Sequence, residues 1–498
     1  MAGLLAGTAG SGAMLRADAP KVSLRPQARP EGAAGSAGAG AAAKPSAAGA
    51  DALIREAQLG GIVSFAVMNT RTGQALESHK GSTGLPPASV TKAITALYAL
   101  DTLGAGYRFK TRLIATGPVT NGRLNGDLVL AGGGDPTLDT DGLADLARQL
   151  KLAGVREVSG KFKVYGGALP FARVIDKSQP EHVGYNPAVS GLNLNFNRVH
   201  FEWKRSGSGY AVTMDARSAK YRPEVRVARM QVKARALPVY TYKDAGSHDA
   251  WTVARDALGK GGSRWLPVRR PEAYAGEVFA TFARAHGIRL GQAELTRKAP
   301  GGQALATRQS APLRDILRDM LKYSTNLTAE VVGMAATAIR KGQVGSIRAS
   351  AEEMTRWARA SLGMGDAKLV DHSGLGAASR LSAAALAAAL VAVRKRGVLR
   401  PILKDIAMRD AKGKVIKSHP IKVSAKTGTL YFVSTLAGYM TAPDGTELAF
   451  AIFAADSKRR AALVNSQDDR PAGSRGWNKR AKQLQQKLIE RWGTVYGS

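Results

Sequence analysis

The chain has 498 residues, of which 44% are hydrophobic, and it contains no cysteine. That length and apolar content suit a globular protein with a substantial core, built as one elaborated domain or as about two to four domains. The absence of cysteine excludes disulfides, thiolate catalysis and cysteine-ligated metal sites. The formal net charge of +34 predicts attraction to a polyanion or an anionic surface such as cell-wall polymer or lipid headgroups. Because the basic residues are dispersed and aromatic residues make up only 6% of the chain, we expect no specific nucleic-acid binding.

Residues 1–50 are rich in Ala, Gly, Pro and Ser, a composition that buries too little surface to fold on its own. The segment LLAGTAGSGAML resembles the apolar region of a signal peptide, and Ala17-Asp18-Ala19 has the form of a cleavage site, although no basic segment precedes it. We interpret residues 1–50 as a signal remnant or a flexible leader, and we expect an exported protein. No apolar run in the body of the chain is long enough to span a membrane.

Folded structure is expected from residue 51, with an amphipathic helix over 51–59 and two strands, 61–69 and 74–79, that form a hairpin. Two prolines and a helical apolar pattern follow in PPASVTKAITALYAL, residues 86–100. Ser89 and Lys92 lie three positions apart in this segment, so they share one face at the beginning of the helix. The spacing places a nucleophile beside a base, but a Ser-x-x-Lys pattern alone is a weak signal.

The sequence pattern changes over residues 110–269 to a mixture of strands, turns and a helix, which we interpret as one or two inserted α+β lobes. A helix is expected over 141–154, and alternating strands are expected in VREVSGKFKVYG and LNLNFNRVHFEWKR. The run Gly132-Gly133-Gly134 lacks the residues of a phosphate-binding loop and is interpreted as a tight turn. Three alternating asparagines form either the outward face of a strand or a contact to a polar ligand: Asn193, Asn195 and Asn197.

Helical patterns return over 271–287 and 311–339, with Ser324-Thr325-Asn326 at a break between two helices. After the segment DHSGLG (371–376) and an alanine-rich helix, three strands are expected at 421–430, 432–440 and 447–455. An amphipathic helix over 477–492 closes the chain. His372, in DHSGLG, is interpreted as a loop residue and not as a ligand or a base, and no metal-binding pattern is present.

Three short motifs therefore occur in order: Ser89-x-x-Lys92, Ser324-x-Asn326 and Lys426-Thr427-Gly428. A serine needs a base to take its proton, and a lysine serves as that base only if desolvation or a second cation lowers its pKa. Lys426 is the candidate second cation and can pair with a substrate carboxylate.

The remaining motif residues have complementary chemistry. The hydroxyls of Thr427 and Thr429 can assist Lys426 at the carboxylate, and Gly428 leaves room for a substrate backbone along the strand edge. The amides of Ser89 and Thr429 are candidates for an oxyanion hole. Ser324 can relay a proton to the leaving amine, and Asn326 can orient Lys92.

The chain resembles the class C low-molecular-mass penicillin-binding proteins, the D-alanyl-D-alanine carboxypeptidase/endopeptidase group. The resemblance extends from residue 51 onward and depends on these segments: PASVTK, LNGDLVLAGGGDPTL, NLNFNRV, YSTNLTAE, DHSGLG and AKTGTL. It implies an α+β fold in which a penicillin-binding transpeptidase/β-lactamase-like domain, an antiparallel sheet flanked by helices, is interrupted by the inserted lobes. The predicted domains are 51–109 with 270–498 for the discontinuous catalytic domain and 110–269 for the insert.

The resemblance also implies roles and partners. Ser89 would be the acylated nucleophile, Lys92 the general base, Ser324 and Asn326 the second motif, and Lys426 the carboxylate and relay residue. The expected substrates are peptidoglycan peptides, cleaved at the terminal D-Ala-D-Ala bond or at the D-Ala cross-link to a diamino acid. The resemblance further implies covalent inhibition by β-lactams, a periplasmic or other extracytoplasmic location, and no cofactor. The alternatives are a β-lactamase, which the long insert disfavours, and a non-catalytic basic wall-binding protein, which the complete motif set disfavours.

Overall fold

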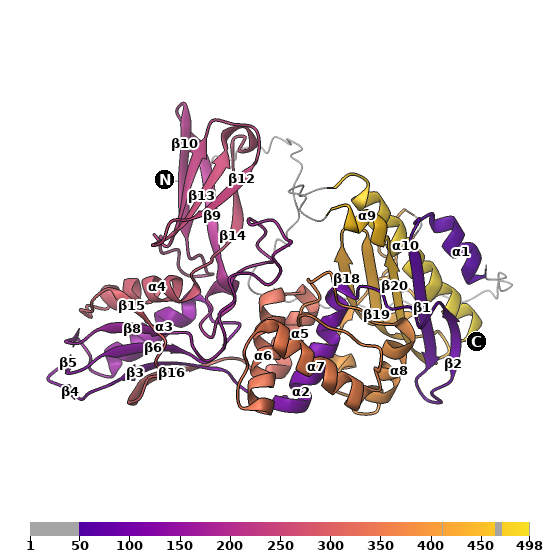
Figure 1. The fold of residues 1–498 in the computed structure, drawn as a ribbon, viewed down its shortest axis with the longest axis horizontal. Helices are drawn as coiled ribbons and strands as arrows, with labels where there is room; N and C mark the ends of the chain where they lie inside the picture. The colour runs from indigo at the N-terminus through magenta and orange to yellow at the C-terminus, as the bar shows by residue number, and fades with distance from the viewer. Residues whose placement is uncertain (1–48, 411, 464–470, 498) are drawn as a thin grey trace, which may run out of the picture.

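The computed structural model describes residues 49–410, 412–463 and 471–497. The predicted signal remnant lies almost entirely outside these residues. The chain folds into a part built on a six-stranded sheet and helices, and a part built on several smaller sheets (Figure 1). No helix in the described part of the chain has both the length and the apolar character needed to cross a membrane.

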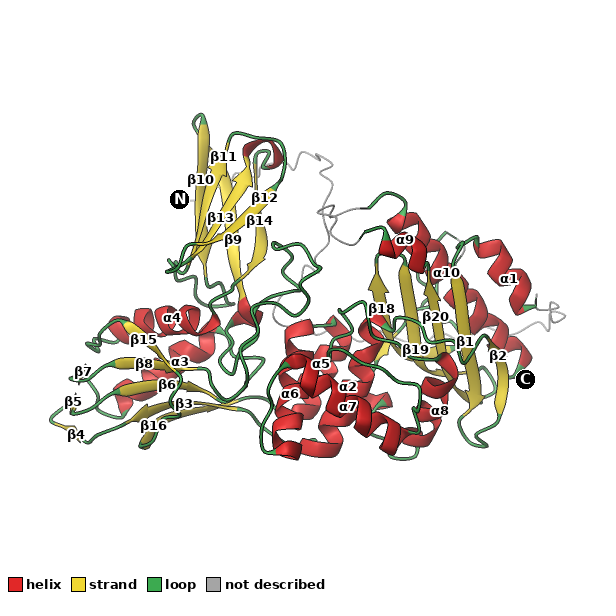
Figure 2. Ribbon diagram, in the orientation of Figure 1, coloured by secondary structure: helices red, strands yellow, loops and turns green. Residues whose placement is uncertain are grey.

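The six-stranded sheet is antiparallel throughout and brings the two ends of the chain together, with strand order β17-β18-β19-β20-β1-β2. Its central strands are apolar on both faces because helices cover both sides of the sheet (Figure 2). Its strands are β1 (Ile62–Asn69), β2 (Ala75–His79), β17 (Lys404–Asp405), β18 (Lys422–Leu430), β19 (Val433–Thr441) and β20 (Glu447–Ala455).

One face of this sheet packs against the terminal helices α1 (Ala50–Ala57) and α10 (Ser474–Val495), where Trp477 and Trp492 are fully buried. The opposite face packs against a helical layer that carries two of the candidate site residues, Lys92 and Asn326. The helices of that layer are α2 (Thr91–Leu103), α5 (Leu313–Tyr323), α6 (Asn326–Lys341), α7 (Ile347–Leu362) and α8 (Ala383–Arg394). A short helix, α9 (Ser457–Ala461), follows β20.

The inserted part contains a five-stranded sheet of order β15-β8-β6-β3-β16, covered by two helices, α3 (Thr140–Leu152) and α4 (Pro271–Ala285). The strands of this sheet are β3 (Lys110–Ala115), β6 (Leu128–Gly132), β8 (Phe162–Tyr165), β15 (Ala293–Thr296) and β16 (Gln303–Gln309). A small sheet at one end of these strands is formed by β4 (Val119–Thr120), β5 (Arg123–Leu124) and β7 (Glu157–Val158) (Figure 2).

Two three-stranded sheets complete the insert and stand above the five-stranded sheet in Figure 1. The first has the order β10-β9-β14, with β9 (Arg198–Ser206), β10 (Gly209–Asp215) and β14 (Gly261–Pro267). The second has the order β11-β13-β12, with β11 (Ala228–Lys233), β12 (Tyr240–Asp244) and β13 (Asp249–Ala254).

The predicted end of the insert at residue 269 is wrong. The helix α4 belongs to the core of the inserted part, β15 pairs with β8, and β16 pairs with β3. The chain therefore returns to the helical layer only after Gln309. Sequence patterns predicted the helix α4 but neither β15 nor β16, whose pairing partners lie more than a hundred residues away.

Both interpretations of the asparagine run are also wrong. Asn193, Asn195 and Asn197 are buried, and the last two have φ values of 51° and 50° in a left-handed turn that precedes β9. Asn195 binds the backbone N–H and the hydroxyl of Thr140, and Asn197 binds the N–H of Leu194 and the carbonyl of Ala188. Their side chains thus satisfy the backbone of an irregular segment. The tight turn expected at the glycine run does not lie there, because Gly132 ends β6, Gly134 has a φ of 79°, and the turn follows at Pro136 and Thr137.

Candidate active site

Ser89 lies in a single 3₁₀ turn, η1 (Ala88–Val90), directly before α2, and its side chain is half-buried. The preceding residue, Ala88, has a φ of 46°, in a region that non-glycine residues rarely adopt. Thr435 of β19 holds the turn by donating to the carbonyl of Pro87 at 2.8 Å, and Gly374 packs against the carbonyl of Ala88. Such enforced backbone strain is concentrated at functional sites.

Lys92, one turn along α2, is fully buried and makes three contacts. Its Nζ lies 3.0 Å from Ser89 Oγ, 2.7 Å from Asn326 Oδ1 and 2.7 Å from the carbonyl oxygen of Ser373. The amide oxygen and the carbonyl oxygen can only accept hydrogen bonds. A neutral amine has two N–H groups, so it would donate both to these acceptors and point its lone pair at Ser89. This arrangement can remove the proton from the Ser89 hydroxyl.

Burial lowers the pKa of Lys92 from 10.5 to about 7, against the opposing effect of the buried carboxylates of Asp371 and Glu330. The neutral amine is therefore accessible near neutral pH, as a general base requires. Lys426 was expected to lower this pKa as a second cation. Burial is the largest cause of the lowered pKa of Lys92, and burial together with repulsion from Lys92 lowers the pKa of Lys426 well below its usual value.

Lys426 lies in β18, with 1% of its surface exposed, and donates to Ser324 Oγ at 3.0 Å and to the carbonyl of Thr427 at 2.7 Å. Ser324 ends α5 with a φ of 61°, and Asn326 begins α6 two residues later. The left-handed residue turns the chain sharply, so that the two side chains of this motif face two different lysines. Ser324 contacts Lys426, whereas Asn326 contacts Lys92.

The strand β18 offers a backbone edge beside Ser89. On one side, β18 pairs with β19 along its whole length. On the other side its neighbour is β17, which pairs with Ser424 and Ala425. Among the described residues, 426–430 therefore have no partner strand on this second side. Thr427 and Thr429 are exposed. Gly428 is packed against the serine turn, and a Cβ at this position would lie 2.9 Å from the Pro87 carbonyl oxygen and 3.0 Å from Ala88 Cβ. An extended peptide can add to such an edge.

Two carboxylates in this site had not been assigned roles from the sequence. Glu330 of α6 is fully buried and accepts hydrogen bonds from the backbone N–H groups of His372 at 3.0 Å and Ser373 at 2.9 Å. Asp371 accepts from the N–H groups of Gly374 at 2.7 Å and Gly376 at 2.6 Å. Together they shape the loop whose Ser373 carbonyl contacts Lys92. Burial is the main cause that raises the pKa of Glu330 to about 8 and that raises the pKa of Asp371.

A sequence signal for Glu330 did exist. It lies four residues after Asn326 in an otherwise apolar helical stretch, and that spacing puts both side chains on one face. His372 is a loop residue, as expected, but it is fully buried, with Nε2 2.8 Å from Ser350 Oγ. Burial lowers the pKa of His372 to about 3, so the ring is neutral and packs against Gly333 of α6.

The structure thus gathers Ser89, Lys92, Ser324, Asn326 and Lys426 into one polar cluster around two buried lysines, beside the free edge that carries Thr427, Gly428 and Thr429. The roles of these residues remain predictions. In the described part of the chain, no group of three or more His, Asp or Glu side chains is arranged to hold a metal ion. The cluster fits nucleophilic acyl transfer by a serine activated by a lysine.

Comparisons with known proteins agree with this chemistry. A family model described as the D-Ala-D-Ala carboxypeptidase 3 (S13) family matches residues 47–470. The D-alanyl-D-alanine carboxypeptidase DacB of Haemophilus influenzae is 25% identical over 426 residues, covering 79% of this chain and 85% of the relative. A D-alanyl-D-alanine carboxypeptidase of an Actinomadura species is 28% identical over 444 residues, covering 81% and 79%.

Solved structures are similar in fold. The crystal structure of penicillin binding protein 4 from Haemophilus influenzae has a TM-score of 0.71 and 21% sequence identity, covering 88% of this chain and 99% of the other. The same protein was also solved in complex with a β-lactam, with a TM-score of 0.70 and 21% identity over 89% of this chain and 98% of that one.

Proposed function

The chain belongs to the D-Ala-D-Ala carboxypeptidase 3 (S13) family, and we propose that Ser89 is the residue acylated in the carboxypeptidase reaction of this member. The resemblance predicted from the sequence is thereby confirmed at the level of the family. The single observation that supports the residue assignment is the position of Lys92 Nζ, 3.0 Å from Ser89 Oγ. It is held there by Asn326 Oδ1 and the Ser373 carbonyl oxygen, which can only accept hydrogen bonds.

The proposed reaction begins with transfer of the Ser89 hydroxyl proton to Lys92. Oγ then attacks the carbonyl carbon of the penultimate D-alanine, and the backbone N–H groups of Ser89 and Thr429 stabilise the oxyanion. The C–N bond breaks, the proton held by Lys92 passes to the departing amine by way of Ser324, and an acyl-enzyme ester remains on Ser89. Water then attacks the ester carbonyl as the neutral Lys92 takes its proton. The C–O bond to Ser89 breaks, Lys92 returns the proton to Ser89 Oγ, and the shortened peptide is released.

Substrate recognition is assigned to β18. A stem peptide would lie along residues 426–430 as an additional strand, and its terminal carboxylate would meet Lys426 together with the exposed hydroxyls of Thr427 and Thr429. A D-Ala cross-link to a diamino acid would use the same acyl donor with a different leaving amine, so endopeptidase activity follows from the same chemistry. The β-lactamase and non-catalytic alternatives are not favoured by the family match.

We propose an extracytoplasmic location, where peptidoglycan peptides and β-lactams meet the enzyme. The net charge of +34 further supports attachment to an anionic wall or membrane surface. A salt titration of binding to purified sacculi tests this attachment. Binding that weakens as salt rises supports the attachment, and a flat response contradicts it.

Labelling with a fluorescent penicillin tests the site. Wild-type protein should form a covalent adduct that survives denaturation, and Ser89→Ala should form none. Ser82→Ala serves as a matched control, because Ser82 is an exposed serine in the preceding loop. Persistent label in Ser89→Ala, or no label in wild type, would refute the assignment. Defined muropeptides then separate carboxypeptidase from endopeptidase activity.

A further inference from the structure

A loop of the inserted part reaches the candidate active site. Residues 169–189, between β8 and β9, lie between the insert and the helical layer. Leu169 and Val189, at the two ends of the loop, pack in one apolar cluster with Leu327, Val331 and Met334 of α6. The loop is therefore anchored on the helix that begins at Asn326.

The loop also contacts Asn326 itself. The amide Nδ2 of Asn326 donates to the backbone carbonyl of Tyr185 at 2.9 Å, while its Oδ1 accepts from Lys92 at 2.7 Å. A backbone carbonyl only accepts hydrogen bonds, so it requires the NH₂ side of the amide. The Tyr185 carbonyl thus directs the NH₂ group toward the loop and leaves Oδ1 for Lys92. If the amide rotated, its NH₂ group would compete with Ser89 for the lone pair of the neutral lysine.

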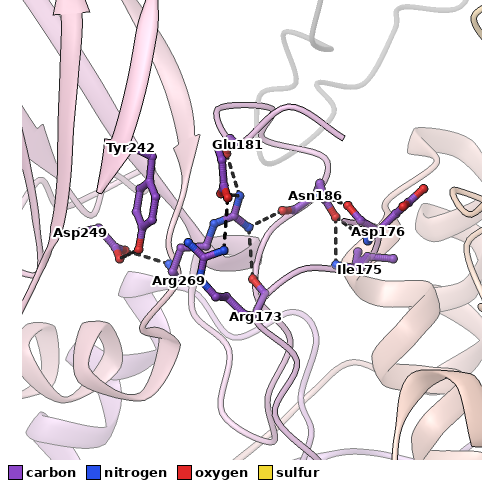
Figure 3. A network of polar contacts seen from close by, with 8 residues as sticks. All are labelled: Arg173, Ile175, Asp176, Glu181, Asn186, Tyr242, Asp249 and Arg269. Carbon is purple, nitrogen blue, oxygen red and sulfur yellow. Dashed lines mark hydrogen bonds and ion pairs between the residues drawn. The ribbon is translucent and has the colours of Figure 1, made fainter. Parts of the chain in front are cut away.

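Asn186, the next residue, braces the loop from within. It is 1% exposed, its Oδ1 accepts from the backbone N–H groups of Ile175 at 2.9 Å and Asp176 at 3.0 Å, and its Nδ2 donates to the carbonyl of Asp176 at 2.8 Å. These three bonds join the two arms of the loop (Figure 3). Tyr185 directly precedes Asn186 in the sequence.

Arg269, between β14 and α4, holds this braced loop (Figure 3). Its guanidinium donates to the backbone carbonyls of Asn186 at 2.6 Å, Glu181 at 2.7 Å and Arg173 at 3.2 Å, and to the Glu181 carboxylate at 3.1 Å. Its backbone N–H donates to the carboxylate of Asp249 in β13 at 2.8 Å. The arginine is 3% exposed, and bonds from a charged, buried donor are stronger than neutral ones. Arg269 thus fastens both arms of the loop with its side chain and joins them to β13 through its backbone N–H.

We propose that Arg269 is a positioning residue for acyl transfer. By holding the loop around Asn186, it keeps the Tyr185 carbonyl against Asn326, and through Asn326 it directs the lone pair of Lys92 at Ser89. The inference rests on the proposed function of Ser89 and Lys92. In this proposal the inserted part influences acyl transfer indirectly. None of its residues in this series of hydrogen bonds contacts the reacting serine.

The test measures the second-order rate constant for acylation by a fluorescent penicillin as a function of pH. Two variants disturb the loop independently: Arg269→Met removes the clamp, and Asn186→Ala removes the internal brace. We expect each to lower the acylation rate about ten-fold or more, because small misplacements of catalytic groups are costly. Loss of the Asn326 acceptor also destabilises the protonated form of Lys92, which lowers the pKa of this lysine. The rising limb of the pH profile should therefore move to lower pH.

Arg229→Met is the matched control, since Arg229 is an exposed arginine in β11 of the same inserted part. It should keep the wild-type rate and profile. Circular dichroism melting identifies a loop variant that fails to fold, and the other loop variant then decides the question. Wild-type rates and an unmoved pH profile in the folded loop variants would overturn the proposal.

A double-variant comparison separates positioning from general weakening. If Arg269 acts through Asn326, Arg269→Met should change the rate by less than about two-fold in an Asn326→Ala background. Effects that multiply in the double variant would overturn the proposal. Failure of the proposed function would look different, because wild-type protein itself would then form no adduct at Ser89.

Discussion

Glu330 and Lys92 are fully buried on two packed helices and are linked through the backbone of Ser373. The carboxylate of Glu330 accepts from the Ser373 N–H at 2.9 Å, and the Ser373 carbonyl accepts from Lys92 at 2.7 Å. One carboxylate therefore fixes the acceptor that orients the candidate base. It also opposes the effect of burial on the pKa of Lys92.

Replacing Glu330 by Gln should destabilise the protein and slow acylation. A glutamine has one acceptor oxygen, so one of the two backbone N–H groups of His372 and Ser373 would face an NH₂ group and lose its partner. An unsatisfied buried donor costs about 1–3 kcal/mol. Thermal unfolding followed by circular dichroism, together with the penicillin acylation rate, checks this expectation. Glu352→Gln, at an exposed position of α7, should change neither quantity appreciably. Equal melting temperatures for the two variants would contradict the role given to Glu330.

The acylation rate should rise with pH through about 7. The reactive form of Lys92 is the neutral amine, burial lowers its pKa to about 7, and the neutral fraction grows as the pH rises above that value. Lys92→Arg keeps a positive charge but does not lose its proton near neutral pH, so it should be inactive over the whole range. A rate that falls between pH 6 and pH 8, or an active arginine variant, would exclude Lys92 as the base.

Lys426 should determine the preference for a free terminal carboxylate. Wild-type protein should cleave a peptide that ends in D-Ala-D-Ala faster than the same peptide with a C-terminal amide. Loss of a hydrogen bond to a charged group costs about 2 kcal/mol, or roughly thirty-fold. Lys426→Met should therefore bring the ratio of kcat/KM for the two peptides close to one. Lys404→Met removes a neighbouring exposed cation of β17 and should keep the preference. If Lys426→Met slows both peptides equally, the lysine serves the chemistry and not carboxylate recognition.

Local patterns in the sequence predicted most single elements of this fold. The strands that became β18, β19 and β20 were expected within a residue or two of their observed bounds, because apolar content and turn residues mark them clearly. The strands β15 and β16, by contrast, were not predicted. Their partners β8 and β3 are far away in the chain, and pairing at such separation leaves no local pattern.

The candidate site likewise contains residues that the sequence could identify and groups that it could not. Ser89, Lys92 and Lys426 were identifiable because their spacing carries chemistry. The carbonyls of Ser373 and Tyr185 were not, since a backbone acceptor has no residue type that marks it. The prediction for Asn193, Asn195 and Asn197 was wrong because alternating polar residues are typical of a strand. In the structure, Asn195 adopts a left-handed conformation with its side chain buried.

Gly428→Ala should reduce acylation by displacing the serine turn. A Cβ at Gly428 would collide with Thr435 Oγ1, which donates to the Pro87 carbonyl, and would lie 2.9 Å from that carbonyl oxygen. Overpacking of this kind costs about 1–3 kcal/mol and moves the backbone. The displaced backbone includes Ala88, whose strained φ of 46° sets the direction of Ser89. Gly209→Ala, at the beginning of β10, is the matched control because its nearest new contact would be Ser206 O at 3.9 Å. A Gly428→Ala protein that acylates at the wild-type rate would show that the turn does not depend on close packing against β18.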